Sequence, residues 1–233
     1  MSNSPAGAAP PKRRLLKPVV TGTNSAHFDS SVNDWDGKYH RLIGTATRTI
    51  SFGYQFVLTD EHIEDLSLLA RLVCKKITHF TFNYSDVSYD AKNDAAAVTD
   101  KGLVRLSKLL PNLRVLKLQG TRLITDDGLV SALKNFWGLR SLEVTGLTGG
   151  CSPISGEAFR VLREHVEYAP ALQSLLLVNG ESSKDFMKAM REMGRARPQL
   201  VVSLVSTSEE KKWGDWELRR ISSHFKNGRR QGI

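Results

Sequence analysis

Residues Pro111–Leu133 read PNLRVLKLQGTRLITDDGLVSAL, and close variants of this stretch recur along most of the chain. Leu113, Leu116 and Leu118 follow the spacing L-x-x-L-x-L, which is typical of the short strand in a repeat protein. Neighbouring residues of a strand point to opposite faces, so we expect Leu116 and Leu118 in the core and Lys117 on the other face. The stretch therefore predicts a buried strand followed by a turn and a helix.

The second half of the stretch carries the signals of a helix start. Thr125 and Asp126 precede Gly128 in the segment ITDDGL. Threonine and aspartate accept hydrogen bonds from the free amides of a first helical turn, and acidic groups suit the positive end of the helix dipole. Leu129 and Leu133, four residues apart, share one helical face. We expect this helix to return the chain to the core.

Further copies of both halves extend the pattern. The strand spacing begins again at Ile77, Leu139 and Leu172, and the helix start recurs from Leu58, Val98 and Ile154, with a weak copy from Glu181. A longer gap between the strands that begin near Ile77 and Leu113 predicts an insertion, on a loop, at residues 83–97. Units that each expose an apolar face must stack to bury it. The sequence thus predicts an α/β fold, a short solenoid with parallel strands on its concave face and helices on its convex face.

These residues resemble the cysteine-containing subclass of leucine-rich repeats. The family pattern is L-x-x-L-x-L-x-x-C-x-x-I-T-D-x-G-L-x-x-L, and the resemblance covers residues 46–206. Cys151 and Cys74 both fall in family cysteine positions, although most of the other such positions hold different residues. The subclass is known from F-box substrate receptors and from antagonist-of-mitotic-exit-network proteins. The resemblance implies a ribonuclease-inhibitor-like arc and a non-catalytic protein-interaction module, as an adaptor or substrate-recognition scaffold related to ubiquitin-ligase receptors.

The flanking segments lack the repeat pattern. Residues 1–45 are rich in Pro, Gly, Ser and Thr, which predicts a mostly disordered basic tail, with Phe28, Trp35 and Tyr39 packed against the first repeat. They show none of the amphipathic periodicity of an F-box. A truncated receptor, whose F-box is missing from this sequence, is therefore a further interpretation. The repeats are assigned to residues 46–207.

Residues 208–233 are interpreted as a capping helix followed by a basic tail. In the segment 209–225, Trp213, Leu218, Ile221 and Phe225 fall on one broad stripe at helical spacing. Such a stripe is expected to cover the last repeat. The alternative is an exposed helix that binds a partner.

The residues expected on the concave face form the candidate partner-binding site. Its first half is polar, and its second half becomes apolar at Leu176, Val178, Val202 and Leu204. An open apolar face usually marks a contact, so we expect either a partner or the chain's own C-terminal helix to cover it. The candidate site residues are His79, Thr81, Lys117, Gln119, Glu143, Thr145, Leu176, Val178 and Leu204.

The charge is concentrated outside the repeats. The chain has a net charge of +9; residues 1–45 carry six Lys/Arg against three Asp, and residues 211–233 carry seven Lys/Arg against two acids. This distribution disfavours a nucleic-acid groove on the repeats and leaves one alternative function, an RNA-associated or nucleolar protein that uses basic tails. No secretory or membrane-spanning segment is predicted, so we expect a cytoplasmic or nuclear protein without membrane contact. Lys12-Arg13-Arg14 is shorter than a usual import signal.

We predict no catalytic residues, metal site or cofactor. Cys151 with His165 is the one pairing that suggests nucleophilic chemistry, but Cys151 and Cys74 occupy positions that the family fills for packing. The histidines lack the clustered spacing of a zinc site. Three aspartates recur at the predicted helix starts, where a capping or first-turn role accounts for them: Asp60, Asp100 and Asp126.

Overall fold

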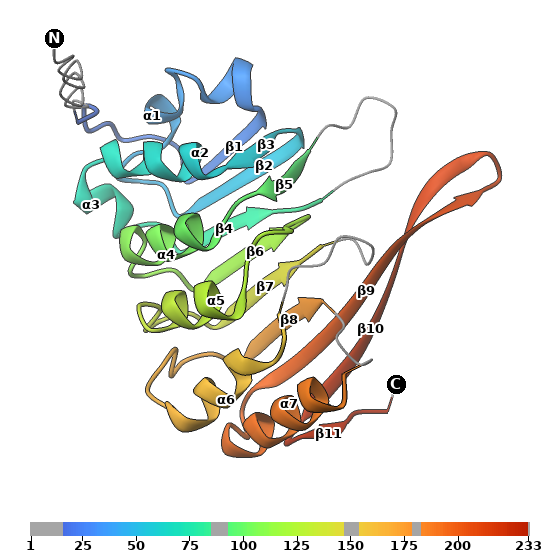
Figure 1. The fold of residues 1–233 in the computed structure, drawn as a ribbon. Coiled ribbons are helices and arrows are strands. Elements are labelled where there is room, and N and C mark those ends of the chain that lie inside the picture. Colours follow the sequence, from blue (N-terminus) through green and yellow to red (C-terminus); the bar gives the residue numbers. More distant parts are fainter. Residues whose placement is uncertain (1–15, 85–92, 147–153, 179–182, 233) are drawn as a thin grey trace, which may run out of the picture.

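The computed structural model describes residues 16–84, 93–146, 154–178 and 183–232 (Figure 1). These residues form a mixed α/β fold on one large sheet with the order β1-β2-β4-β6-β7-β8-β9-β10-β11. Neighbouring strands are parallel from β1 to β9, and β10 and β11 are antiparallel. The strands are β1 Ser25–Ser30, β2 Thr49–Gln55, β4 His79–Phe82, β6 Val115–Gln119, β7 Ser141–Thr145, β8 Ser174–Val178, β9 Val201–Lys212, β10 Asp215–Lys226 and β11 Arg229–Arg230.

The larger helices follow one another along one side of the sheet (Figure 1). Each of α5 to α7 directly follows a strand of the main sheet, as expected of strand–helix units, whereas a short strand of a second sheet separates β4 from α4. No helix among the described residues is long and apolar enough to cross a membrane. The helices are α1 Tyr39–Leu42, α2 Asp60–Asp65, α3 Arg71–Cys74, α4 Asp100–Leu109, α5 Asp126–Leu133, α6 Glu157–Glu164 and α7 Lys184–Ala196, with short helical turns at Ser31–Trp35 and Leu66–Leu68.

The core lies between the sheet and the helices. In β6, Leu116 and Leu118 are fully buried, whereas Lys117 between them is partly exposed. The parallel register aligns Leu116 with Phe80 on one side and with Leu142 on the other. Alternate strand residues of each unit therefore form continuous apolar rows. The predicted α/β class with parallel strands is confirmed.

The predicted insertion is partly structured. Residues 94–97 form β5 (Asp94–Ala97), which pairs with β3 (Val57–Thr59) in a small separate sheet. Residues 85–92 of the insertion lie outside the described residues. The expectation of a plain loop is therefore wrong for the end of the segment.

Aspartates at the helix starts link one unit to the next. The carboxylate of Asp100, the first residue of α4, accepts hydrogen bonds from the Thr125 amide at 2.7 Å and from the Thr125 hydroxyl at 2.6 Å. Thr125 is the residue before α5, so each of these bonds ties the start of one helix to the start of the following one. Bonds to an ionised acceptor are stronger than those between neutral groups.

The same link recurs at the neighbouring junctions. Asp60 accepts from the amide and hydroxyl of Thr99, at 3.0 and 2.5 Å. Asp126 accepts from the amide and hydroxyl of Ser155, at 2.6 and 2.9 Å, and from the Ala158 amide at 2.8 Å. We call these three links the aspartate ladder. The aspartates do lie in first helical turns, but the prediction that they serve their own helix is corrected: their carboxylates complete the next unit.

At two of the three junctions the ladder explains the glycine of the helix-start motif, whereas the third junction has Ala158 at that position. A Cβ placed on Gly128 would lie 1.9 Å from Oδ1 of Asp100, and one on Gly102 would lie 2.0 Å from Oδ1 of Asp60. Real Cβ atoms do not approach oxygen so closely. The glycine therefore gives the aspartate of the preceding unit room to reach the helix start.

The N-terminal segment adds the first strand of the sheet. β1 pairs in parallel with β2, aligning Phe28 with Phe52. The indole of Trp35 donates to Oδ2 of Asp65 at 2.9 Å, and the Tyr39 hydroxyl donates to the Asp65 carbonyl at 2.9 Å. Packing of these three aromatic residues against the first unit is confirmed. Disorder up to residue 45 is wrong for residues 25–42, because the aromatic cluster closes the core there; residues 1–15 lie outside the described residues.

The C-terminal segment is a β-hairpin, not the predicted capping helix. In the described part of the chain, β8 pairs with residues 201–205 of β9, and β10 pairs with β9 along residues 201–212. Trp213 and Gly214 both have positive φ, which gives the two-residue turn favoured in hairpins. The helical stripe was misleading because Gly214 disfavours a helix and an unpaired strand edge requires a partner.

Candidate interaction surface

The sheet face opposite the helices carries the candidate site. On it lie the strand residues that alternate with the buried core residues, and we call it the open face. From β4 to β9 the open face consists of His79, Thr81, Val115, Lys117, Gln119, Ser141, Glu143, Thr145, Ser174, Leu176, Val178, Val201, Ser203 and Val205.

Glu143 is the centre of a hydrogen-bond network on the open face. Its Oε1 accepts from Nε2 of Gln119 at 2.8 Å and from the Thr145 hydroxyl at 3.2 Å, and its Oε2 lies 3.6 Å from Nζ of Lys117. The Glu143 side chain is only 5% exposed. A buried carboxylate needs such partners, because an unpaired buried charge is strongly destabilising. The network therefore fixes polar side chains of the two neighbouring strands β6 and β7 in place.

Two segments from outside the repeated units attach to this network. Nη2 of Arg220, on β10, donates to Oε1 of Glu143 at 2.6 Å, across 77 residues of sequence. The amide of Tyr84, just after β4, donates to Oε1 of Gln119 at 2.9 Å. The hairpin and the start of the insertion are thereby both anchored to the open face. Arg220 and Tyr84 thus join the candidate site.

The predicted site residues are brought together only in part. Lys117, Gln119, Glu143 and Thr145 form the network, as predicted neighbours on adjacent strands. The other polar members, His79 and Thr81, lie on β4 next to β6, and the His79 ring bonds locally to the Thr78 hydroxyl at 2.9 Å. Leu176 and Val178 lie on β8 next to Glu143.

Leu204 does not belong to the candidate site. The register aligns Leu204 with the buried Leu177 and places Ser203 beside Leu176. Leu204 and Val202 therefore point into the core, where each is 1% exposed. In the other units the first buried residue of the strand comes three positions after the leucine that precedes the strand, as Leu175 does after Leu172. In the last unit Val202 comes only two positions after Leu200. A shift of one residue turns every side chain of a strand to the other face.

The expected apolar patch is correspondingly smaller. Of its four predicted members, only Leu176 and Val178 lie on the open face, and Val178 is buried. The predicted cover by a C-terminal helix is wrong, because that segment pairs with the edge of the sheet as β10. Val205 adds an apolar side chain to the open face but is 1% exposed. The accessible surface here is mainly polar.

A chain of Ser, His and Asp side chains lies at the other end of the open face. Nδ1 of His27 is 2.9 Å from Oγ of Ser51, and Nε2 is 3.1 Å from Oδ1 of Asp29. In serine hydrolases the two ring nitrogens have the opposite assignment, with Nε2 toward the serine. Both His27 and Asp29 are more than half exposed. We interpret these bonds as cross-strand contacts that align β1 with β2.

Cys74, the cysteine within the described residues, gives no sign of a reactive thiol. Cys74 is buried, its Sγ lies 3.7 Å from the Leu66 carbonyl, and burial raises the pKa of its thiol. A raised pKa disfavours the thiolate form that acts as a nucleophile. Cys151 lies outside the described residues, and His165 contacts Oε1 of Glu167 at 2.8 Å. Among the described residues no group of three or more His, Cys, Asp or Glu side chains is arranged to hold a metal ion.

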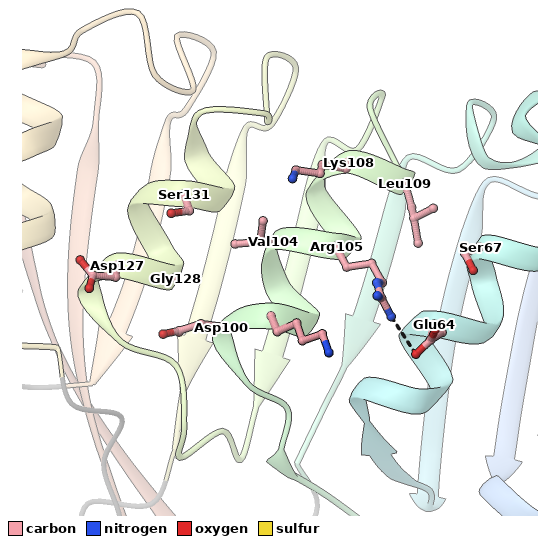
Figure 2. Close-up of a pocket in the computed structure, with 11 residues that line it drawn as sticks. Glu64, Ser67, Asp100, Val104, Arg105, Lys108, Leu109, Asp127, Gly128 and Ser131 are labelled. Atoms are coloured by element: carbon pink, nitrogen blue, oxygen red, sulfur yellow. Dashed lines mark ion pairs between the residues drawn. The ribbon is translucent and has the colours of Figure 1, made fainter. Parts of the chain in front are cut away.

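The helix side carries a shallow groove between α2, α4 and α5 (Figure 2). It has a volume of about 570 Å³. Arg105 crosses it to reach Glu64, with 2.8 Å between Nη1 and Oε2. Asp100, at its floor, already bonds to Thr125. Three of the polar side chains that line the groove, Glu64, Arg105 and Asp100, are thus already engaged with other residues.

Sequence reasoning missed Arg220 and the Tyr84 amide. The pair WG at 213–214, between a stretch rich in β-branched residues and a second run of similar length, was a usable hairpin signal. A hairpin prediction would have placed Arg220 on a strand beside β9. The bond between Tyr84 and Gln119 had no comparable signal, because it depends on the path of the insertion.

Comparison with known proteins does not extend these observations. No protein-family model matches the sequence, and no curated protein is significantly similar to it.

Proposed function

We propose that the chain is a short leucine-rich-repeat solenoid whose open, concave face binds a protein partner. Supporting this fold are the recurring strand and helix-start motifs, the parallel register and the aspartate ladder between consecutive units. Repeat proteins of this kind present one sheet face as an extended binding surface. The process served, such as adaptor or substrate-recognition work resembling that of ubiquitin-ligase receptors in the cytoplasm or nucleus, is proposed from the resemblance alone.

One observation carries the proposal: the network around Glu143 holds polar side chains in fixed positions on a face that the helices do not cover. Pre-ordered side chains lose less conformational entropy when a partner binds. Lys117 and Arg220 are each more than one-third exposed, so a partner can still contact them. The adjoining Leu176 supplies an apolar contact beside this polar group.

A matched pair of variants tests the proposal. Thr81→Arg with Leu176→Arg adds two bulky cations to the open face at positions that are only partly buried. Ser67→Arg with Leu72→Arg adds the same groups to exposed positions on the helical side. The tagged proteins are purified from their own cells, and bound proteins are quantified by mass spectrometry.

We expect a defined set of partners to be lost from the open-face variant and kept by the helix-side variant. Thermal melting of both variants checks that they are folded. A partner set that is identical for the wild type and the open-face variant contradicts the proposal.

A further inference from the structure

Two neighbouring depressions at the C-terminal end of the fold share Arg195. The first has a volume of about 450 Å³ and is lined by three cations and two amide side chains: Arg195, Lys226, Arg229, Asn227 and Gln231. Among the described residues, no carboxylate side chain lines it. The second lies along α7 and is lined by Lys184, Met187, Lys188, Arg191, Glu192 and Arg195. Together they make a continuous cationic region on the folded part of the chain.

The cations of α7 lie on one exposed helical face. Lys184, Lys188, Arg191 and Arg195 are spaced by four, three and four residues, which places them in a row along the axis. At a rise of 1.5 Å per residue, this row is about 16 Å long. Two acids adjoin the four cations in sequence: Glu192 is engaged with Arg163, and Asp185 lies next to Lys184 in the first turn of the helix. The row therefore keeps its positive charge.

A tight turn brings two further cations to this row. Gly228 (φ +69°), in the turn between β10 and β11, lies so close to α7 that an added Cβ would be 2.4 Å from the Arg191 carbonyl. On the helix side, a Cβ on Gly194 would be 2.9 Å from the Gly228 amide nitrogen. These two glycines allow the turn to contact the helix directly. Lys226 and Arg229, which flank the turn, are thereby fixed beside Arg195.

Six cations define what we call the α7–β11 surface: Lys184, Lys188, Arg191, Arg195, Lys226 and Arg229. None of them forms an ion pair with another described residue. By contrast, the nearby Arg197 is turned inward and donates to the carbonyls of Leu162, His165 and Tyr168. A cluster of exposed cations without acidic partners repels itself unless an anion binds.

We propose that the α7–β11 surface binds the phosphate backbone of a nucleic-acid duplex without reading its sequence. Lysine and arginine contacts to phosphates supply such binding. No large apolar side chain is strongly exposed in residues 183–197 or 225–232, so the surface lacks the groups that insert into a membrane or stack on single-stranded bases. The region is distinct from the Glu143 network, and the proposed nucleic-acid contact lies on the folded elements α7, β10 and β11.

Fluorescence anisotropy with labelled 20-base-pair RNA and DNA duplexes tests this proposal. The full chain is compared with Arg191→Glu/Arg195→Glu, and with the control Lys101→Glu/Lys108→Glu on α4, which changes the net charge equally. We expect at least a tenfold loss of affinity in the first variant and less than threefold in the control. About six phosphate contacts also predict a roughly thousandfold loss between 50 and 200 mM salt, with a shallower salt dependence in the first variant.

Three results would overturn the proposal. One is equal weakening by both variants, which would indicate a general effect of net charge. Another is undiminished binding by Arg191→Glu/Arg195→Glu. The third is binding to vesicles containing phosphatidylserine or to polyglutamate but not to either duplex. If the charge-reversed protein does not fold, Arg191→Gln/Arg195→Gln is used in its place, and its folding is checked by thermal melting. We expect this variant to bind duplexes about tenfold more weakly than the wild type.

Discussion

The middle of the molecule and its C-terminal end are built on different principles. Between α4 and α6, each unit repeats the same contacts: a leucine row in the sheet and an aspartate that bonds to the next helix start. At the C-terminal end, β9 joins the sheet by pairing its residues 201–205 with β8, and the long β9–β10 hairpin is further attached by the bond from Arg220 to Glu143 and by the packing of a glycine turn on α7. The middle is stabilised by contacts that recur from unit to unit, whereas the side-chain contacts that attach the hairpin each occur once.

This difference determines how a change spreads through the molecule. In the middle, each unit covers the apolar face of its neighbours, so damage to one unit removes support from two. On the outer part of the hairpin, side chains such as Ile221 are half exposed and support little else. We therefore expect large, cooperative effects in the middle and small, local effects at the hairpin.

The largest expected effect comes from Leu116→Asp. The substitution places a charge among fully buried side chains, and an unpaired buried charge costs several kcal/mol or more. We expect the cooperative unfolding transition to disappear in urea titrations followed by circular dichroism. Ile221→Asp on the hairpin introduces the same group at a position that is 54% exposed, with an expected change below about 0.5 kcal/mol. A Leu116→Asp protein that melts normally would show that the core register is wrong.

The aspartate ladder predicts an unusual response to alanine. Gly128→Ala brings a Cβ against Asp100, and the expected destabilisation is about 1–3 kcal/mol. In an Asp100→Ala background the same substitution is expected to stabilise the protein by up to about 1 kcal/mol, because alanine favours a helix more than glycine does. Urea unfolding of the four proteins measures this change of sign. Equal effects in both backgrounds would disprove the steric role of the glycine.

The contact of the hairpin with the sheet has a smaller expected effect. Arg220→Ala removes a charge-assisted bond to the buried Glu143, and we expect a loss of about 1–2 kcal/mol, since Arg220 itself is 37% exposed. The control is Arg219→Ala, which removes an exposed ion pair to Glu210 and is expected to cost less than about 1 kcal/mol. Similar losses in the two variants would show that Glu143 does not anchor the hairpin.

The smallest expected effect concerns the start of α2. There the Thr59 amide bonds to a histidine of the same helix instead of to an aspartate of a preceding unit. Nδ1 of His62 accepts from the Thr59 amide at 3.1 Å, and burial lowers the pKa of His62 against the opposing effect of Asp65, Asp36 and Glu61. The unfolded chain then binds a proton more readily than the folded one, so this residue destabilises the protein as the pH falls below 6.5.

His62→Gln tests that pH dependence. Glutamine can still accept from the Thr59 amide but does not titrate. We expect the variant to lose less stability than the wild type between about pH 7.5 and 5.5, even if its stability at neutral pH is lower. Stability is measured by urea unfolding across this range. Parallel curves for the two proteins would contradict the assignment.

The repeated part of the fold can be predicted well from the sequence because each unit places buried residues at the same positions of its strand. Leu116, Leu142 and Leu175 recur at matching positions, so the face that each strand buries can be read from spacing alone. The hairpin occurs once, so no second copy supports a prediction. Its apolar residues also fit the spacing of a helix. Strand pairing there is decided by the edge of β9, which is a tertiary feature. The aromatic cluster of Trp35 and Tyr39 was visible in the sequence, but pairing by β1 was not.

The same distinction applies to the candidate site. Lys117, Gln119 and Glu143 were predictable, since their strands are in register. Leu204 was predicted on the wrong face because the segment before β9 is one residue shorter than in the other units. The alternation of residues alone does not show which face is buried; the pairing of β9 with β8 does. Arg220 is 77 residues from Glu143, beyond any local pattern. Long-range polar contacts of this kind depend on where the hairpin lies.

The aspartate ladder runs in one direction along the chain, and it would allow the number of units to change. Each carboxylate reaches forward to complete the helix start of the following unit. A duplicated copy of one unit, inserted in phase, would find both of its bonding partners already in place. An inverted or shuffled unit would not. The antiparallel return of β10 occupies the edge where another parallel strand would be added, so growth in whole units is possible within the chain but not beyond its last strand.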